Sequence, residues 1–153
     1  MSITSFSRVV CFHLILSYFC IFHHLFIDFM KNLKKYYKLG ASPADIYNAL
    51  TNQIMIEIWT GDKADFKAEP GYEFSLWDGA ITGRNVAFEM DRKIKQVWFF
   101  DEVESEVIIT LHPDKKGTSV ELVHNNIPDE AFENISEGWD LDYFSSLAEL
   151  FND

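Results

Sequence analysis

Apolar and polar residues alternate through most of the segment from Lys63 to Asn126, which is the pattern of half-buried β-strands. Residues with turn chemistry divide this segment, and Asp78-Gly79 has the clearest hairpin-turn composition. We expect a loop at Pro113–Gly117 and the end of the last strand at Asn125-Asn126. The pattern therefore predicts strands at 64–68, 72–76, 80–88, 93–100, 105–111 and 118–124.

The pattern before this segment predicts one strand and two short helices. Residues 33–39 alternate among lysines, as a first strand would. Ser42 is a candidate helix cap, because its hydroxyl can accept a free backbone N–H, and Pro43 suits the first helical turn. This helix is expected to stop near Thr51-Asn52, with a second short helix or turn at 53–59.

The last segment, Pro128–Asp153, predicts a long amphipathic helix with Pro128 in its first turn. Its bulky apolar residues recur at spacings of three and four, which places them on one face. They are Phe132, Ile135, Trp139, Tyr143, Leu147 and Leu150. Such a face needs a large concave apolar surface, and the preceding strands can supply it as a curved antiparallel sheet. The order predicts an α+β fold with one domain, residues 30–153.

Residues 1–29 form a hydrophobic extension that allows three interpretations. The apolar run Val9–Ile27 is long enough for a membrane anchor, but it contains three histidines, which hydrocarbon disfavours. A signal peptide would end at a cleavage site with small residues, and the sequence has no such site here. We favour an over-long start, with translation beginning at Met30. We expect a cytoplasmic protein, anchored to a membrane only if 1–29 is translated and retained.

Composition narrows the function classes. The formal charge of −11 disfavours nucleic acid as a partner and, for residues 30–153, an anionic membrane surface. The same charge can favour a basic partner. Both cysteines, Cys11 and Cys20, precede residue 21, so the folded region has no cysteine nucleophile, disulfide or cysteine zinc site.

No motif for phosphate binding, metal binding or a hydrolase nucleophile is found, and we expect no cofactor, no metal and no catalytic residue. His124 shares strand parity with Val120 and Leu122, so it can face or rim a cavity. It is a conceivable general base, although a hydrogen-bonded structural histidine is the preferred interpretation. The carboxylates at 101–106 are interpreted as a solvated acidic edge.

The order of elements and several stretches together resemble the activator of heat-shock-protein-90 ATPase homologue family. The resemblance covers Leu33 to about Phe151. It rests on Ser42–Thr51, Phe74–Gly79 with Ile81-Thr82-Gly83, Val97–Phe100, Gly117–His124, and Gly138-Trp139 to Leu147. This family belongs to the START-like, birch-pollen-allergen-like (SRPBCC) superfamily. The resemblance implies a helix-grip fold, in which a curved sheet wraps a long C-terminal helix. The eukaryotic activator adds a separate chaperone-binding domain, which has no counterpart in this sequence.

Two functions follow as expectations. The first is non-catalytic binding of a lipid-like or aromatic molecule between the sheet and the last helix, as single-domain members resemble binders of hydrophobic molecules. The candidate cavity residues are Trp59, Phe74, Leu76, Gln96, Trp98, Phe100, Ile109, Val120, Leu122, His124, Trp139 and Tyr143. Ser105 is a further polar candidate. The alternative is a protein-interaction module that regulates a chaperone ATPase through its acidic surface. A cyclase-type enzyme with His124 as base is a third interpretation.

Overall fold

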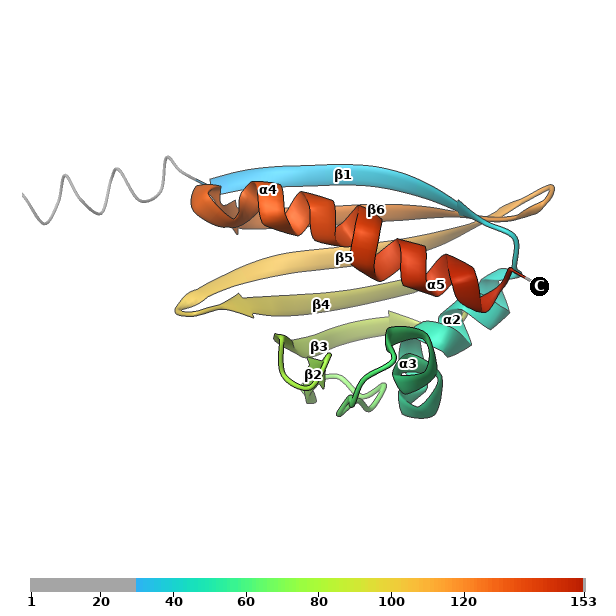
Figure 1. Cartoon of the computed structure of the whole chain (residues 1–153), viewed down its shortest axis with the longest axis horizontal. Coiled ribbons are helices and arrows are strands. Elements are labelled where there is room, and N and C mark those ends of the chain that lie inside the picture. Colours follow the sequence, from blue (N-terminus) through green and yellow to red (C-terminus); the bar gives the residue numbers. More distant parts are fainter. Residues whose placement is uncertain (1–29, 153) are drawn as a thin grey trace, which may run out of the picture. The chain divides into compact units, whose positions relative to one another are not determined.

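A six-stranded sheet forms the centre of the computed structural model, which describes residues 30–152 (Figure 1). The strand order is β1-β6-β5-β4-β3-β2, and the pairs from β2 to β6 are antiparallel. The strands are β1 (Met30–Leu39), β2 (Glu73–Leu76), β3 (Ile81–Glu89), β4 (Lys93–Phe100), β5 (Val103–Asp114) and β6 (Gly117–Pro128). Strands β2 to β6 form a meander, in which each strand lies beside the next one in sequence. β1 lies at the edge of the sheet beside β6.

The core lies on one face of this sheet, because every second side chain of the central strands is buried there. Ile94, Val107 and Leu122 are examples, each at most 2% exposed. The side chains on the opposite face are half-buried and include ion pairs such as Lys95–Glu106 at 3.1 Å. The alternation in the sequence therefore reports the two faces of the sheet.

Two short helices, α2 (Pro43–Thr51) and α3 (Gln53–Thr60), follow β1 as predicted. The Ser42 hydroxyl accepts the Asp45 N–H at 3.2 Å and caps α2. Asn52 ends α2 and also caps α3, since its Oδ1 accepts the Ile54 N–H at 3.0 Å. One residue thus separates the two helices.

The C-terminal helix crosses the buried face of the sheet, as Figure 1 shows for α4 and α5 beside β5 and β6. It consists of α4 (Asp129–Gly138), a π-helical turn η1 (Trp139–Phe144) and α5 (Ser145–Leu150). A π-turn accommodates one extra residue, and here Trp139, Tyr143 and Phe144 all become buried. Phe144, absent from the predicted helix face, stacks on Tyr37 of β1 with ring centroids 3.9 Å apart. The α+β helix-grip fold class is confirmed.

Three local predictions were wrong. The predicted strand at 64–68 contributes only an isolated bridge between Asp65 and Ser75. Its backbone N–H groups donate to side chains of α3 instead. The Phe66 N–H donates to the Gln53 Oε1 at 3.1 Å, and the Ala64 N–H donates to the Glu57 Oε1 at 3.3 Å. These bonds hold the segment against the helix and prevent a full ladder.

The other two errors concern the last hairpin. The predicted loop 113–117 is a tight turn, because Pro113 and Asp114 still pair with Thr118 and Gly117. β6 does not end at 125–126 but continues to Pro128, which precedes the first helical residue rather than occupying the first turn. Composition marked turn residues correctly, but it could not show that the ladder continues through them.

Candidate functional site

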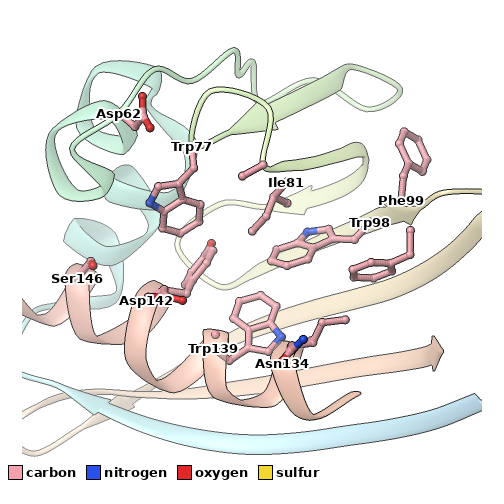
Figure 2. Close-up of a pocket in the computed structure, with 14 residues that line it drawn as sticks. Asp62, Trp77, Ile81, Trp98, Phe99, Asn134, Trp139, Asp142 and Ser146 are labelled. Atoms are coloured by element: carbon pink, nitrogen blue, oxygen red, sulfur yellow. The ribbon is translucent and has the colours of Figure 1, made fainter. Parts of the chain in front are cut away.

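A pocket of about 610 Å³ lies between the C-terminal helix, the end of β4 and the turn after β2. Figure 2 shows Trp98 and Phe99 coming from the sheet, and Trp139 and Asp142 from the helix that faces it. The lining residues are Asp62, Trp77, Ala80, Ile81, Trp98, Phe99, Phe100, Asn134, Ile135, Gly138, Trp139, Asp142, Tyr143 and Ser146. Most of the wall is aromatic or aliphatic.

Two stacked indoles form the centre of the wall. The rings of Trp98 and Trp139 lie 4.6 Å apart with an interplanar angle of 23°. Tyr143 packs against Trp139 at 4.6 Å and 54°. Trp77 closes the other side, with its ring 6.0 Å from that of Tyr143. Aromatic pairs at these separations attract each other beyond their buried area, so the wall is a mutually stabilised cluster.

A chain of buried amides holds Trp98 in place. Its indole N–H donates to the Gln96 Oε1 at 3.0 Å. The Gln96 amide donates to the Asn85 Oδ1 at 3.0 Å, and the Asn85 amide donates to the Lys67 carbonyl at 2.8 Å. Asn85 lies where β3 changes register against β4. This chain fixes the direction of the indole, because any rotation would leave a buried polar group unpaired.

A second chain holds Trp139 and leads back to Trp98. The Trp139 indole N–H donates to the His124 Nδ1 at 3.1 Å. Because Nδ1 accepts, the ring proton sits on Nε2, which donates to the Ser105 Oγ at 2.8 Å. The Ser105 hydroxyl in turn donates to the Trp98 carbonyl at 3.2 Å. Helix and sheet are thus joined by a continuous chain of hydrogen bonds behind the pocket.

His124 is neutral in this setting. The side chain is fully buried, and burial lowers its pKa from an ordinary value of 6.5 to about 3. Its only unprotonated nitrogen already accepts the indole N–H of Trp139. A general base needs a free lone pair facing the substrate, so the geometry favours the structural interpretation of His124 over a catalytic one.

The turn after β2 carries Trp77 into the pocket through an unusual backbone. Trp77, Asp78 and Gly79 have φ angles of 49°, 52° and 94°, all in the left-handed region. A bulky residue there is uncommon, and such strain gathers at functional sites. In Figure 2 the Trp77 indole extends from this turn toward the helix. The alternation in β2 could not predict this, since it ends before the turn.

One polar group of a buried side chain lines the pocket without a protein partner. The Tyr143 residue is 6% exposed, and its hydroxyl has no partner among the side-chain hydrogen bonds of residues 30–152. No side-chain oxygen or nitrogen in this region is both sealed from solvent and unpaired, so the hydroxyl keeps accessible surface at the pocket it lines. Burial raises the pKa of Tyr143, which keeps the hydroxyl protonated at neutral pH. Asp62, Asn134, Asp142 and Ser146 supply the other polar atoms.

The structure divides the twelve predicted cavity residues into two groups. Four line the pocket: Trp98, Phe100, Trp139 and Tyr143. The other eight are buried in the core and do not line the pocket: Trp59, Phe74, Leu76, Gln96, Ile109, Val120, Leu122 and His124. Gln96, His124 and Ser105, expected as polar pocket groups, instead anchor the indoles from behind. The alternation in the sequence identifies which side chains of a strand face the core. It does not show where the C-terminal helix leaves that face open as a pocket.

The described residues hold no group of three or more His, Cys, Asp or Glu side chains placed to bind a metal ion. Within the carboxylates at 101–106, Glu104 pairs with Arg84 at 3.3 Å and Glu106 with Lys95 at 3.1 Å. The three histidines of the hydrophobic extension, His13, His23 and His24, lie outside the residues that the structure describes. No helix between residues 30 and 152 is long and apolar enough to cross a membrane.

Comparison with known proteins identifies the family. Residues 40–152 match the model for "activator of Hsp90 ATPase homolog 1-like protein". An activator of 90 kDa heat shock protein ATPase homolog from Dictyostelium discoideum is 35% identical over 127 residues, covering 80% of this chain and 33% of the relative. A mouse homolog 1 is 27% identical over 114 residues, covering 72% and 34%. The chain thus spans about a third of the length of these relatives.

Solved structures share the fold. An HSP90 activator from Plasmodium falciparum superposes with a TM-score of 0.70 at 23% identity, covering 80% of this chain and 95% of that one. The Aha1 dimer from Colwellia psychrerythraea gives 0.71 at 17%, covering 80% and 96%. A protein from Mesorhizobium loti gives 0.69 at 25%, covering 78% and 96%. The family resemblance found in the sequence is confirmed.

Proposed function

The chain belongs to the family of activator of Hsp90 ATPase homolog 1-like proteins, and we propose that its domain binds an apolar small molecule, without catalysis, in the aromatic pocket. One observation carries this proposal: a pocket of about 610 Å³ stays open beneath a wall of stacked aromatic rings. That volume falls within the range of roughly 300–1,000 Å³ typical of ligand sites. If these residues formed only hydrophobic core, their side chains would fill this space.

The pocket is also preorganised. Both central indoles are held by buried hydrogen bonds, Trp98 to Gln96 and Trp139 to His124. A ligand therefore meets a wall whose rotamers are already ordered, and it does not have to supply the entropy of ordering them. The engaged His124 supports binding rather than acid–base chemistry.

A neutral fluorescent probe of apolar sites, N-phenyl-1-naphthylamine, tests this proposal. We expect its emission to rise and shift to the blue on binding. Ile81→Trp, which places a larger side chain in the pocket, should remove at least nine-tenths of the signal. Ile54→Trp is the matched control, because Ile54 is 69% exposed on α3 and outside the pocket. Ala80→Trp is a second filling variant at an exposed lining position. Equal probe binding in all these proteins would refute the proposal.

A second function, regulation of an Hsp90-type chaperone ATPase, is favoured by the relatives and by the acidic outer face of the C-terminal helix. Asp129 and Asp140 form ion pairs with β1 lysines, Lys31 and Lys35, each at 2.7 Å. Five carboxylates of the helix make no ion pair within residues 30–152. Four of them lie outside the pocket and are exposed: Glu130, Glu133, Glu137 and Glu149. The fifth, Asp142, lines the pocket. A basic surface of a partner would complement this row.

An ATPase assay with the Hsp90-type chaperone of the same organism tests this second function. We expect stimulation by the wild-type chain, and loss of most of it in the double variant Glu133→Lys/Glu137→Lys. The control Glu69→Lys/Glu73→Lys makes the same charge change at exposed residues away from the helix. Absence of stimulation and of co-purification would exclude the chaperone role and leave ligand binding untouched. We propose the cytoplasm for either activity, since residues 21–153 contain no cysteine.

A further inference from the structure

We infer that the pocket selects apolar molecules that carry a positive charge at one end, such as an amine on an aromatic or aliphatic body. This inference rests on the proposed ligand binding and adds the chemical class of the ligand. The charged side chains of the lining are two carboxylates, Asp62 and Asp142, and the lining contains no lysine, arginine or histidine. A fatty acid or another anion would meet repulsion without a compensating cation.

Both carboxylates keep oxygens available to a ligand, although the Asp62 Oδ1 accepts the Lys63 backbone N–H at 2.8 Å. Neither forms an ion pair within residues 30–152, although eight such pairs exist there. The contrast with Asp140 is informative, since Asp140 lies two positions before Asp142 and is occupied by Lys35 and by the Tyr37 hydroxyl, each at 2.7 Å. Residues two positions apart on a helix lie on different sides, so Asp140 faces β1 while Asp142 lines the pocket.

The Tyr143 hydroxyl gives independent support for a polar ligand group. The Tyr143 side chain is more than nine-tenths buried and lines the pocket, and its hydroxyl has no partner among the hydrogen bonds of residues 30–152 while keeping accessible surface at the pocket. A tyrosine hydroxyl on an otherwise buried ring normally finds a partner, and a ligand amine can supply one because its N–H groups donate to the phenolic oxygen. Asp142, the preceding residue in η1, lines the same pocket, so a ligand amine there can meet both the hydroxyl and a carboxylate.

The aromatic wall adds a further attraction for a cation. Trp77, Trp98 and Trp139 line the pocket, and indole faces attract ammonium groups more strongly than other side-chain rings do. In the view of Figure 2, the Trp77 indole lies between Asp62 and Asp142. A charged end held there would place the apolar body against the stacked pair, Trp98 and Trp139. The formal charge of −11 would also raise the local concentration of cations.

Three ligands with one body and different ends test this inference: 4-phenylbutylamine, 4-phenylbutan-1-ol and 4-phenylbutyrate. The chain has four tryptophans, so four indole N–H signals report binding in an NMR titration. Trp77, Trp98 and Trp139 line the pocket, while Trp59 lies outside it with its indole N–H bound to the Ala49 carbonyl at 2.9 Å. We expect the three pocket signals to shift and the Trp59 signal to stay.

We expect the amine to bind at least threefold more tightly than the alcohol, and the acid to bind most weakly. Asp142→Asn should remove most of the preference for the amine, and added salt should reduce it. Glu149→Gln is the control for net charge, because Glu149 is exposed on α5 and outside the pocket. Tyr143→Phe should weaken amine and alcohol binding while the stacked wall remains.

The outcomes separate this inference from the proposed function. Equal affinities for amine and alcohol, or tightest binding of the acid, would overturn the preference for a cation while apolar binding stands. The same holds if Asp142→Asn and Glu149→Gln reduce amine binding equally, since the effect would then be general electrostatics. If none of the three ligands moves the pocket signals, the proposed function fails as well.

Discussion

His124 should make the domain less stable in mild acid. Its pKa is about 3 in the folded chain, against an ordinary value of 6.5, because the ring is buried. Above pH 6.5 the ring is neutral in both states and has no effect on the pH dependence. Below it, the unfolded chain takes up a proton that the folded chain refuses, so the free energy of unfolding falls. The loss continues until the pH reaches about 3.

The size of this effect follows from the difference in pKa. Each pH unit between the two values removes about 1.4 kcal/mol. From pH 8 to pH 5 the loss due to His124 is therefore about 2 kcal/mol, a large part of the stability of a small domain. Asp114, Glu121 and Asp140, whose pKa values are lowered by their ion pairs, act mainly below this window.

Urea unfolding at a series of pH values between 8 and 5 measures the slope. The wild type should lose about 2 kcal/mol more than His124→Gln over this range, since glutamine does not titrate. His112→Gln is the matched control, because His112 is an exposed histidine that pairs with Glu121 at 2.9 Å. NMR of the imidazoles gives a second measurement on the wild type alone. The His124 ring should stay in the Nε2–H form from pH 8 to pH 4. A ring that titrates near pH 6.5, or identical slopes for wild type and His124→Gln, would refute this reasoning.

Three further predictions concern stability, each measured by urea unfolding at neutral pH. Trp139→Phe leaves the His124 Nδ1 buried without its donor, and should cost about 1–3 kcal/mol; a change below about 0.5 kcal/mol would contradict the hydrogen-bond chain. Gly83→Ala places a Cβ against the Val97 backbone oxygen of the neighbouring strand, closer than a Cβ can approach, and should cost at least about 1–3 kcal/mol, whereas Gly40→Ala, with nothing within 4 Å, should change stability far less. Ser42→Ala removes a helix cap and should cost about 1 kcal/mol; an unchanged midpoint would mean that water replaces the cap.

Much of the fold could be predicted from local patterns. The alternation of 93–100 predicted β4 with its observed bounds, because a half-buried strand must alternate. Ser42-Pro43 likewise located the start of α2, since capping depends on residues adjacent in sequence. The π-turn was not predicted. Phe144 is buried through an extra residue in the turn, and its stacking on Tyr37 is a contact between segments 107 positions apart.

The candidate site was only partly predictable. Trp98 and Tyr143 line the pocket, and parity and helical periodicity had both directed them to the buried face. Trp77 was missed, since a left-handed turn places it there and periodicity ends before that turn. Gln96 and His124 were expected to face a ligand, but their hydrogen bonds to indoles direct them away from it.

By itself, the sequence determined the class of the fold, the buried face of each central strand, the long C-terminal helix and the family. These depend on local periodicity and on capping chemistry. Only the tertiary structure decided which buried residues pack into the core and which line an open pocket. That division depends on how helix and sheet approach each other, and on partners for polar atoms that lie far apart in the chain. The Tyr143 hydroxyl and the Asp142 carboxylate became candidate ligand groups through that arrangement alone.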